Sequence, residues 1–569
     1  MADDRLNFKR AMYCWNLENE RLEAETYLCG RRRDFTTTYM RVANLQYIIC
    51  QQPEIVREST VAALCQVLEG TEHIRQRQVF FLFKKAADAL AAIVSEPTPD
   101  ESAARACRAL SRLLSARTGH PFRAVAEAMG SLPLVTACPD PDFSKDETIP
   151  VLELPDLTTL LQGPLPQNCY WAGRSLIMED PLAPEHRRIV IKFARPGQPN
   201  AELAAEACWM QYLGGLSLPE GERLTVPEPL SDKSPLVLQI TDKRIAAAAG
   251  PDIDPDRHAV CFRVHRDYFN YPNHPRNNGG QGEAQDPMIS RTACRRILSH
   301  NARLFGLLAA RGIVHTAPIP LFHNRVQRHR REDRGLYEWR RGGRLDQWLA
   351  SCRYPNISGS GPRDFEHFIA FDGPARRLYE HIGSHVFSLV LIAGSYCRNH
   401  DPARVGLDAS GEPVDARDLF DPAWLKQVLR DVFNSYYEGF TGRPPTGSPP
   451  CDMEGLCSRL IEEMGVDRHM EEILRVAEQQ AMTRDEFEAF LAARGFSRQA
   501  IAALEKGRQD IQILTGPHLG GFNQRISVPE LTEYAAALAA LCIMDRYLSQ
   551  RQRAGQQPPR LLPPGCGEL

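Results

Sequence analysis

Residues 186–206 read His-Arg-Arg-Ile-Val-Ile-Lys-Phe-Ala-Arg-Pro-Gly-Gln-Pro-Asn-Ala-Glu-Leu-Ala-Ala-Glu, and this stretch decides the fold. A β-branched run ends in Lys192, a turn rich in proline and glycine follows, and a helix then begins that carries Glu202 and Glu206. A strand lysine paired with a glutamate of the next helix is one way in which nucleotide-binding proteins hold phosphates. An ordinary strand–turn–helix with a surface lysine explains these residues equally well. The residues around the stretch must decide between the two interpretations.

Strands are expected on both sides of it. Residues 170–178 predict a hairpin that turns at Gly173 and Arg174. A mostly apolar run at 235–240 predicts a buried strand after the helix. Turn strand, lysine strand, helix and later strands follow one another in the order of the N-terminal lobe of a protein kinase.

A second informative group lies near His315. A helix is expected over 292–311, and Gly-Ile-Val-His follows it. In protein kinases such a helix precedes His-Arg-Asp-x-x-x-x-Asn, the catalytic loop. Here Asn324 follows His315 by nine residues, but Ala317 stands where the catalytic aspartate would be. The frame predicts a kinase-like loop without its base, which indicates a pseudokinase or an enzyme with different chemistry.

Candidate metal ligands follow this loop. Asp364-Phe365-Glu366 is a variant of the kinase Asp-Phe-Gly element, whose aspartate holds Mg²⁺. Asp372, which precedes a glycine, competes for the same role. Between the two groups lies a basic run, residues 325–344, that begins with Arg325. A solvated charge run is the usual explanation of such a cluster; the alternative is a surface for phosphates or an acidic polypeptide.

Length and composition indicate a protein of several domains. The chain has 569 residues, and its net charge of −3 provides no global attraction for nucleic acid or anionic membrane. The sequence has no signal-peptide core and no apolar run long enough to span a membrane. The 16 cysteines are scattered, as in proteins of a reducing compartment. We therefore expect a cytoplasmic protein, with secretion as an effector left open.

The expected fold class is α+β: a two-lobed kinase-like domain after a HEAT-like helical array and before a mainly helical region. Three similar amphipathic segments predict the array, although a plain helical bundle explains them equally: Val56–Leu68, Val79–Val94 and Ala103–Leu114. Such an array would offer a concave face to a protein partner. The expected boundaries are a helical domain at 1–136, a linker with an edge element at 137–168, the kinase-like domain at 169–400, a helical region at 401–552 and a flexible tail at 553–569. The helices expected after 375 are Leu378–Ala393, Asp421–Tyr437, Met453–Glu478, Arg484–Ala493, Ser497–Lys506 and Val528–Gln550.

The region 169–400 resembles the SidJ-type bacterial pseudokinases of the protein-kinase-like superfamily. The resemblance rests on Ile-Val-Ile-Lys192, on the helix with Glu202 and Glu206, and on the stretch from His315 to Asn324. Members of that family use ATP and Mg²⁺ to adenylylate a carboxylate and then join it to the amine of glutamate. The resemblance therefore implies protein glutamylation, or AMPylation, rather than conventional phosphotransfer.

The resemblance also implies roles for individual residues. Lys192 would hold the phosphates, and Glu202 or Glu206 would orient it. Asn324 and Asp364 would bind Mg²⁺. Arg174 or an arginine of 325–344 would meet the acyl-adenylate.

Gly173 and Arg325 complete the candidate nucleotide contacts, and His315 completes the candidate catalytic set. The best-known member of the family is activated by calmodulin, but Asp-Ile-Gln-Ile-Leu at 510–514 lacks the basic residues of such a motif, so calmodulin is not an expected partner. The competing hypothesis is a catalytically inactive scaffold that recruits a protein through its helical array. A weaker third one is nucleic-acid binding through 325–344.

Overall fold

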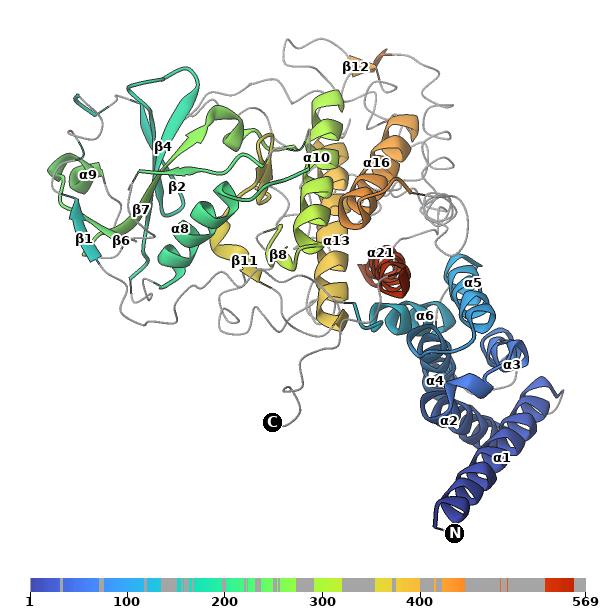
Figure 1. The fold of residues 1–569 in the computed structure, drawn as a ribbon. Helices are drawn as coiled ribbons and strands as arrows, with labels where there is room; N and C mark the ends of the chain where they lie inside the picture. Colours follow the sequence, from blue (N-terminus) through green and yellow to red (C-terminus); the bar gives the residue numbers. More distant parts are fainter. Residues whose placement is uncertain are drawn as a thin grey trace.

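The computed structural model contains a strand-rich part and a larger helical part (Figure 1). It describes residues 2–30, 34–70, 76–116, 120–134, 151–154, 168–196, 201–219, 224–230, 237–248, 256–272, 291–319, 354–370, 375–399, 422–445 and 528–556, with a few isolated positions between them. The expectation of a mixed helical and sheet protein is confirmed. Of the helices within these ranges, none has both the length and the apolar character that crossing a membrane requires.

The sheet contains the lysine strand at its centre. Its strand order is β1-β6-β7-β4-β3-β2, and β5 (Glu228–Pro229) also pairs with β7. All pairs are antiparallel except β1 with β6. The remaining strands are β1 (Val151–Leu154), β2 (Cys169–Ala172), β3 (Ser175–Glu179), β4 (Arg187–Phe193), β6 (Val237–Ile240) and β7 (His258–His265).

Both faces of β4 are buried, which explains why it reads as a continuous apolar run. Ile189 and Ile191 belong to an apolar cluster on one face, and Val190 belongs to a second cluster on the other. Helix α8 (Ala201–Gly214) packs on the second face through residues such as Met210. Because side chains alternate along a strand, Lys192 points to the same face as Val190 and therefore towards α8.

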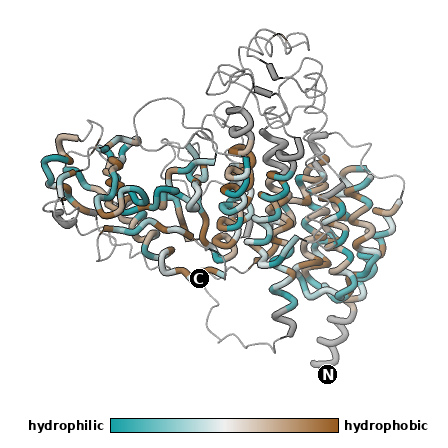
Figure 2. Tube along the Cα trace, turned by 90° about the horizontal axis from the view of Figure 1, so that it is seen from above, coloured by the Kyte–Doolittle hydropathy of each residue, from teal (hydrophilic) through white to brown (hydrophobic). Residues whose placement is uncertain are grey.

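The helical part has one continuous apolar core. Helices α10 (Arg291–Ala309), α13 (Ala375–Asn399), α16 (Pro422–Thr441) and α21 (Val528–Gln556) pack together, and α6 (His120–Gly130) joins them through α13 and α21. In the view from above, the N-terminal helices stand beside these long helices and the sheet lies at the opposite end (Figure 2).

The N-terminal helices form two rows. Contacts link α2 (Phe35–Gln51), α4 (Gln76–Ser95) and α6 in one row, and α1 (Ala2–Cys29), α3 (Glu58–Glu69) and α5 (Asp100–Ala116) in the other. The three predicted helical segments are confirmed as α3, α4 and α5. The C-terminal end of α21 packs on this array, where Tyr547 donates a hydrogen bond to the carbonyl of Ser95 at 3.3 Å.

The predictions for the remaining regions can be compared with the structure only in part. The linker at 137–168 does contain an edge element, since β1 is the outermost strand of the sheet. Helices expected over Leu378–Ala393, Asp421–Tyr437 and Val528–Gln550 are confirmed as α13, α16 and α21. The last of them continues to Gln556, into the predicted tail, because its sequence remains helix-prone. The helices expected over Met453–Glu478, Arg484–Ala493 and Ser497–Lys506 lie outside the described residues, apart from single positions, and so does the rest of the tail.

Two glycines allow α10 and α16 to cross closely. A Cβ atom on Gly306 would lie 2.4 Å from the carbonyl oxygen of Tyr436, and one on Gly439 would lie 2.3 Å from that of Arg303. We predict that Gly306→Ala destabilises the protein by about 1–3 kcal/mol, since the helices must move apart. Thermal melting measures this. Gly214→Ala is the control because nothing lies within 4 Å of its added methyl group, so equal melting temperatures for the two variants would contradict the close crossing.

Candidate functional site

The buried lysine of β4 is the centre of the candidate site. Its Nζ lies 2.8 Å from Oε2 of Glu206 on α8, and the Glu206 side chain is almost fully buried. The strand-and-helix pairing expected for Lys192 is therefore present, and Glu206 is the partner. Glu202 lies at the start of the same helix, and its side chain is outside the described residues.

A second carboxylate reaches the lysine from a distant part of the chain. Asp364 also forms an ion pair with Lys192, although 172 residues separate them. Asp364 follows a short hairpin, β9 (Ile357–Ser358) and β10 (Gly361–Pro362), and has left-handed backbone angles, φ 60° and ψ 63°. This conformation is uncommon for a residue with a side chain, and Asp is among those that tolerate it best.

The hairpin between β2 and β3 brings a third group to the site. Gly173 has φ +62° at the first position of the two-residue turn, as a type II′ hairpin turn requires. Arg174, at the second position, forms an ion pair with Glu366, and both side chains are less than 10% exposed. Glu366 also lies 3.7 Å from Nζ of Lys192. The predicted nucleotide-contacting turn is thus connected to the lysine through Glu366.

The buried cations and carboxylates of the cluster shift one another's pKa values. Two cations, Lys192 and Arg174, meet the carboxylates of Glu206, Asp364 and Glu366. Burial alone would lower the pKa of Lys192, but the carboxylates outweigh burial and raise it above its ordinary value. Burial raises the pKa of Glu206 to about 7, despite Lys192, and the other carboxylates add to the rise. Burial also opposes ionisation of Glu366, but Lys192 and Arg174 lower its pKa to about 2.

His315 holds the Asp364 segment in place. It lies on β8 (Ile313–His315), which pairs with β11 (Phe368–Ala370). Its Nδ1 accepts a hydrogen bond from the Ala317 backbone N–H at 3.2 Å, so Nε2 carries the proton and donates to the carbonyl of Arg363 at 2.7 Å. With both nitrogens engaged and the ring fully buried, His315 is a positioning residue for its neighbour Asp364 rather than a group exposed to substrate.

A second histidine supports the first from the helical part. His385 of α13 donates from Nε2 to the carbonyl of His315 at 2.9 Å. Its Nδ1 then accepts from the Tyr436 hydroxyl of α16, also at 2.9 Å. The ring stacks on Phe305 of α10 with centroids 4.6 Å apart. Three helices of the helical core therefore hold the backbone on which the site is built.

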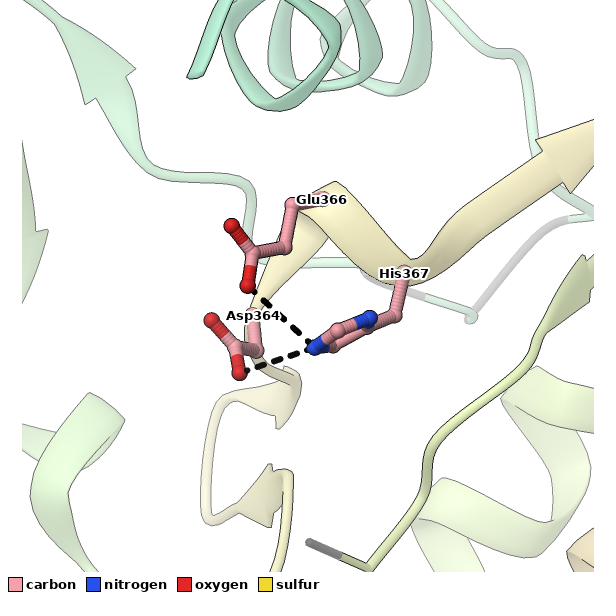
Figure 3. A group of neighbouring side chains, drawn as sticks. All are labelled: Asp364, Glu366 and His367. Carbon is pink, nitrogen blue, oxygen red and sulfur yellow. Dashed lines mark ion pairs between the residues drawn. The ribbon is translucent and has the colours of Figure 1, made fainter. Parts of the chain in front are cut away.

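The structure brings three potential metal ligands together (Figure 3). Asp364, Glu366 and His367 each offer one atom, and these atoms lie within 4.8 Å of one another. Of the predicted metal ligands only Asp364 falls in the described part of the chain. Asn324, Arg325, Asp372 and the basic run 325–344 lie outside it.

Sequence reasoning named Asp364 but gave no role to Glu366 and His367, which lie in the same group of potential ligands. The signal was present, because an acidic residue and a histidine follow Asp364 within three positions. Comparison with known proteins does not add to this picture: no protein-family model matches the chain, and neither does a curated protein. The geometry of the site therefore carries the inferences that follow.

We predict that Lys192→Met lowers the free energy of unfolding by about 3–5 kcal/mol, because it leaves buried carboxylates without their shared cation. Chemical denaturation measures the change. Arg187→Met is a matched control on the same strand, since Arg187 and Glu228 form an ion pair at 3.5 Å with both side chains more than half exposed. Equal effects of the two substitutions would contradict the buried network.

A pH dependence follows from the two buried histidines. Burial lowers the pKa of His315 and of His385 from 6.5 to about 3. Below pH 6.5 these two histidines therefore bind protons in the unfolded chain but not in the folded chain. The free energy of unfolding decreases as pH falls from 6.5 towards 3. The loss is up to about 1.4 kcal/mol per pH unit for each histidine.

Melting temperatures between pH 8 and about pH 5 test this. We expect His385→Phe to melt lower than the unchanged protein at pH 8, since hydrogen bonds are lost, but to show a shallower decline on acidification. Parallel curves for the two proteins would show that His385 does not remain neutral in the folded state.

Proposed function

We propose that this chain binds ATP with a divalent cation and transfers its adenylyl group to a carboxylate, with ligation of glutamate as the subsequent step. The observation that carries the proposal is the meeting of Lys192 with Glu206 and Asp364. Three separate elements supply these residues: a central strand, the helix after it and the segment after a β-hairpin. In kinase-fold proteins a strand lysine pairs with a helix glutamate to hold the phosphates, and an aspartate nearby holds Mg²⁺.

The order of elements supports a kinase-like interpretation of this region. A hairpin, the lysine strand β4, helix α8 and further strands of the same sheet follow one another. The long helix α10, strand β8 with His315, the β9–β10 hairpin and Asp364-Phe365-Glu366 then follow in the expected sequence. The pairing of β8 with β11 lays the His315 segment beside the Asp364 segment.

The proposed chemistry does not need the missing base. Ala317 is fully buried, and its backbone N–H binds His315. A serine or threonine hydroxyl must lose a proton during phosphotransfer, whereas a carboxylate is already ionised at neutral pH. Positioning and charge neutralisation then become the main demands on the site, and a cation-lined cluster meets both.

The transfer balances in two steps. A carboxylate oxygen attacks the α-phosphorus of ATP, the bond to the bridging oxygen breaks, and pyrophosphate leaves with the electron pair. The amine of glutamate then attacks the acyl carbon, AMP leaves, and the amine releases a proton to solvent. In this proposal Lys192 and Arg174 exchange carboxylate partners for phosphate oxygens, and a cation near Asp364 neutralises phosphate charge.

A second candidate function, a scaffold without catalysis, is favoured by a different observation. Helices α1 and α2 expose large apolar side chains, among them Trp15 at 59% and Tyr47 at 53%. An exposed patch of this kind is typical of protein-binding surfaces. In that case the closed ion-pair cluster around Lys192 would be structural, and the two rows of helices would carry the interaction.

The decisive experiment supplies radiolabelled ATP and radiolabelled glutamate to the full chain with Mg²⁺ or Mn²⁺ and candidate acceptor proteins. We expect ATP with a divalent cation to raise the melting temperature and label to appear in protein. Lys192→Arg, which keeps the charge that the carboxylates need, is expected to remain folded and to lose at least tenfold in labelling.

The control substitution is Arg187→Lys on the exposed part of the same strand, which should label normally. No thermal shift with ATP, together with no label under any metal condition, would exclude the enzyme and favour the scaffold. A thermal shift without label in protein would support nucleotide binding and exclude the transfer.

A further inference from the structure

The proposed function gives no role to His367, which lies within the cluster. Its side chain is fully buried, and its Nε2 lies 3.3 Å from Oδ2 of Asp364 and 3.4 Å from Oε1 of Glu366. Figure 3 shows this nitrogen directed at the two carboxylates, which converge on it from the same side.

These distances are long for a charge-assisted hydrogen bond. An imidazolium that paired with carboxylates would bring nitrogen and oxygen to about 2.7–2.9 Å. Two ligand atoms bound at about 2.0–2.1 Å to one tetrahedral cation lie about 3.3–3.4 Å apart, from the geometry of a tetrahedron. The separations of Nε2 from both carboxylate oxygens therefore match two edges of such a tetrahedron.

The opposite oxygens of the same carboxylates are already held. Oδ1 of Asp364 pairs with Lys192, and Oε2 of Glu366 pairs with Arg174. The backbone of His367 is also fixed, since its carbonyl accepts hydrogen bonds from the N–H and the hydroxyl of Thr316 at 2.8 and 3.0 Å. Partners of this kind orient metal ligands in proteins. The other oxygen of each carboxylate faces Nε2 of His367.

The donor set decides which metal fits. Mg²⁺, the ion that the kinase resemblance implies, takes oxygen ligands in near-octahedral geometry. An imidazole nitrogen with two carboxylates suits divalent transition metals instead.

We infer that Asp364, Glu366 and His367 form a three-ligand site for a divalent transition-metal ion, of the Mn²⁺ or Zn²⁺ class, in preference to Mg²⁺. Three protein ligands leave a coordination position open. The metal site itself does not depend on the proposed function. Only the use of the metal depends on the proposed function. Next to Lys192, the open coordination position would accept a phosphate oxygen of the proposed nucleotide.

The test measures metal binding without nucleotide. The chelator-treated full chain is titrated with Mn²⁺, a suitable probe because it binds cysteine thiolates less readily than Zn²⁺. Electron paramagnetic resonance of free Mn²⁺ gives the affinity, and nitrogen modulation in the pulsed spectrum reports an imidazole ligand. We expect one bound Mn²⁺ with a nitrogen ligand, and competing Mg²⁺ to be at least tenfold weaker.

Two variants identify the ligands. His367→Gln is expected to lose the nitrogen modulation and at least tenfold in Mn²⁺ affinity, and Glu366→Gln to lose affinity but keep the modulation in what still binds. His265→Gln is the matched control, because His265 and Asp267 form an exposed pair at 3.4 Å and, within the described ranges, belong to no group of three potential ligands. Melting curves establish that each variant is folded.

The inference is overturned if Mn²⁺ does not bind, if Mg²⁺ competes equally, or if His367→Gln retains the nitrogen signal. Its failure is distinguishable from that of the proposed function. ATP binding with Mg²⁺ and no Mn²⁺ preference would remove the metal inference alone. Mn²⁺ binding that depends on His367, with no response to ATP, would remove the proposed function alone.

Discussion

The ammonium group of Lys192 is the constraint on which the rest of the site depends. A charged lysine inside a protein is costly unless carboxylates surround it, and here they come from α8 and from the segment after β10. Since these partners follow Lys192 by 14 and by 172 residues, the charge is fully compensated only when the sheet, the helix and the hairpin have all reached their final positions. The ion-pair cluster therefore connects the sheet to the helical part of the protein.

Hydrogen bonds from the helical part hold the segment that carries Asp364. Tyr436, His385 and His315 form a chain that starts on α16 and ends at the carbonyl of Arg363, next to Asp364. A left-handed aspartate is a conformation that costs about 1–3 kcal/mol and persists only where the surroundings determine it. The chain of hydrogen bonds is such a determinant, and it gives His315 a structural role beside Asp364.

Glu366 gives the cluster its distinctive electrostatics. The resemblance to kinases would place a glycine here, which leaves space and adds no charge. Here Glu366 contacts both Arg174 and Lys192, so the two cations that would hold phosphates already have an anionic partner. In the proposed function a nucleotide would replace these contacts, and the exchange of carboxylate for phosphate would keep the cations neutralised.

The amino-acid sequence by itself determined the local elements and the residue types of the site. The apolar run before Lys192 predicted β4, the Gly-Arg pair predicted the hairpin, and amphipathic spacing predicted α3, α10, α13 and α21, because period and propensity are local properties. Sequence also singled out His315 and Asp364. It could not choose between Glu202 and Glu206, nor recognise the cluster formed by Glu366 and His367.

Those choices depend on distances between segments far apart in the chain. Only the tertiary structure brings Asp364 to Lys192 across 172 residues, and only burial turns neighbouring side chains into a coupled network of charges. The merging of the N-terminal helices with α13 and α21 in one apolar core is likewise invisible to periodicity, which reveals that a face is apolar but not which partner covers it. The local patterns therefore predicted the helices, the strands and the candidate residues, and tertiary packing determined which of them are in contact.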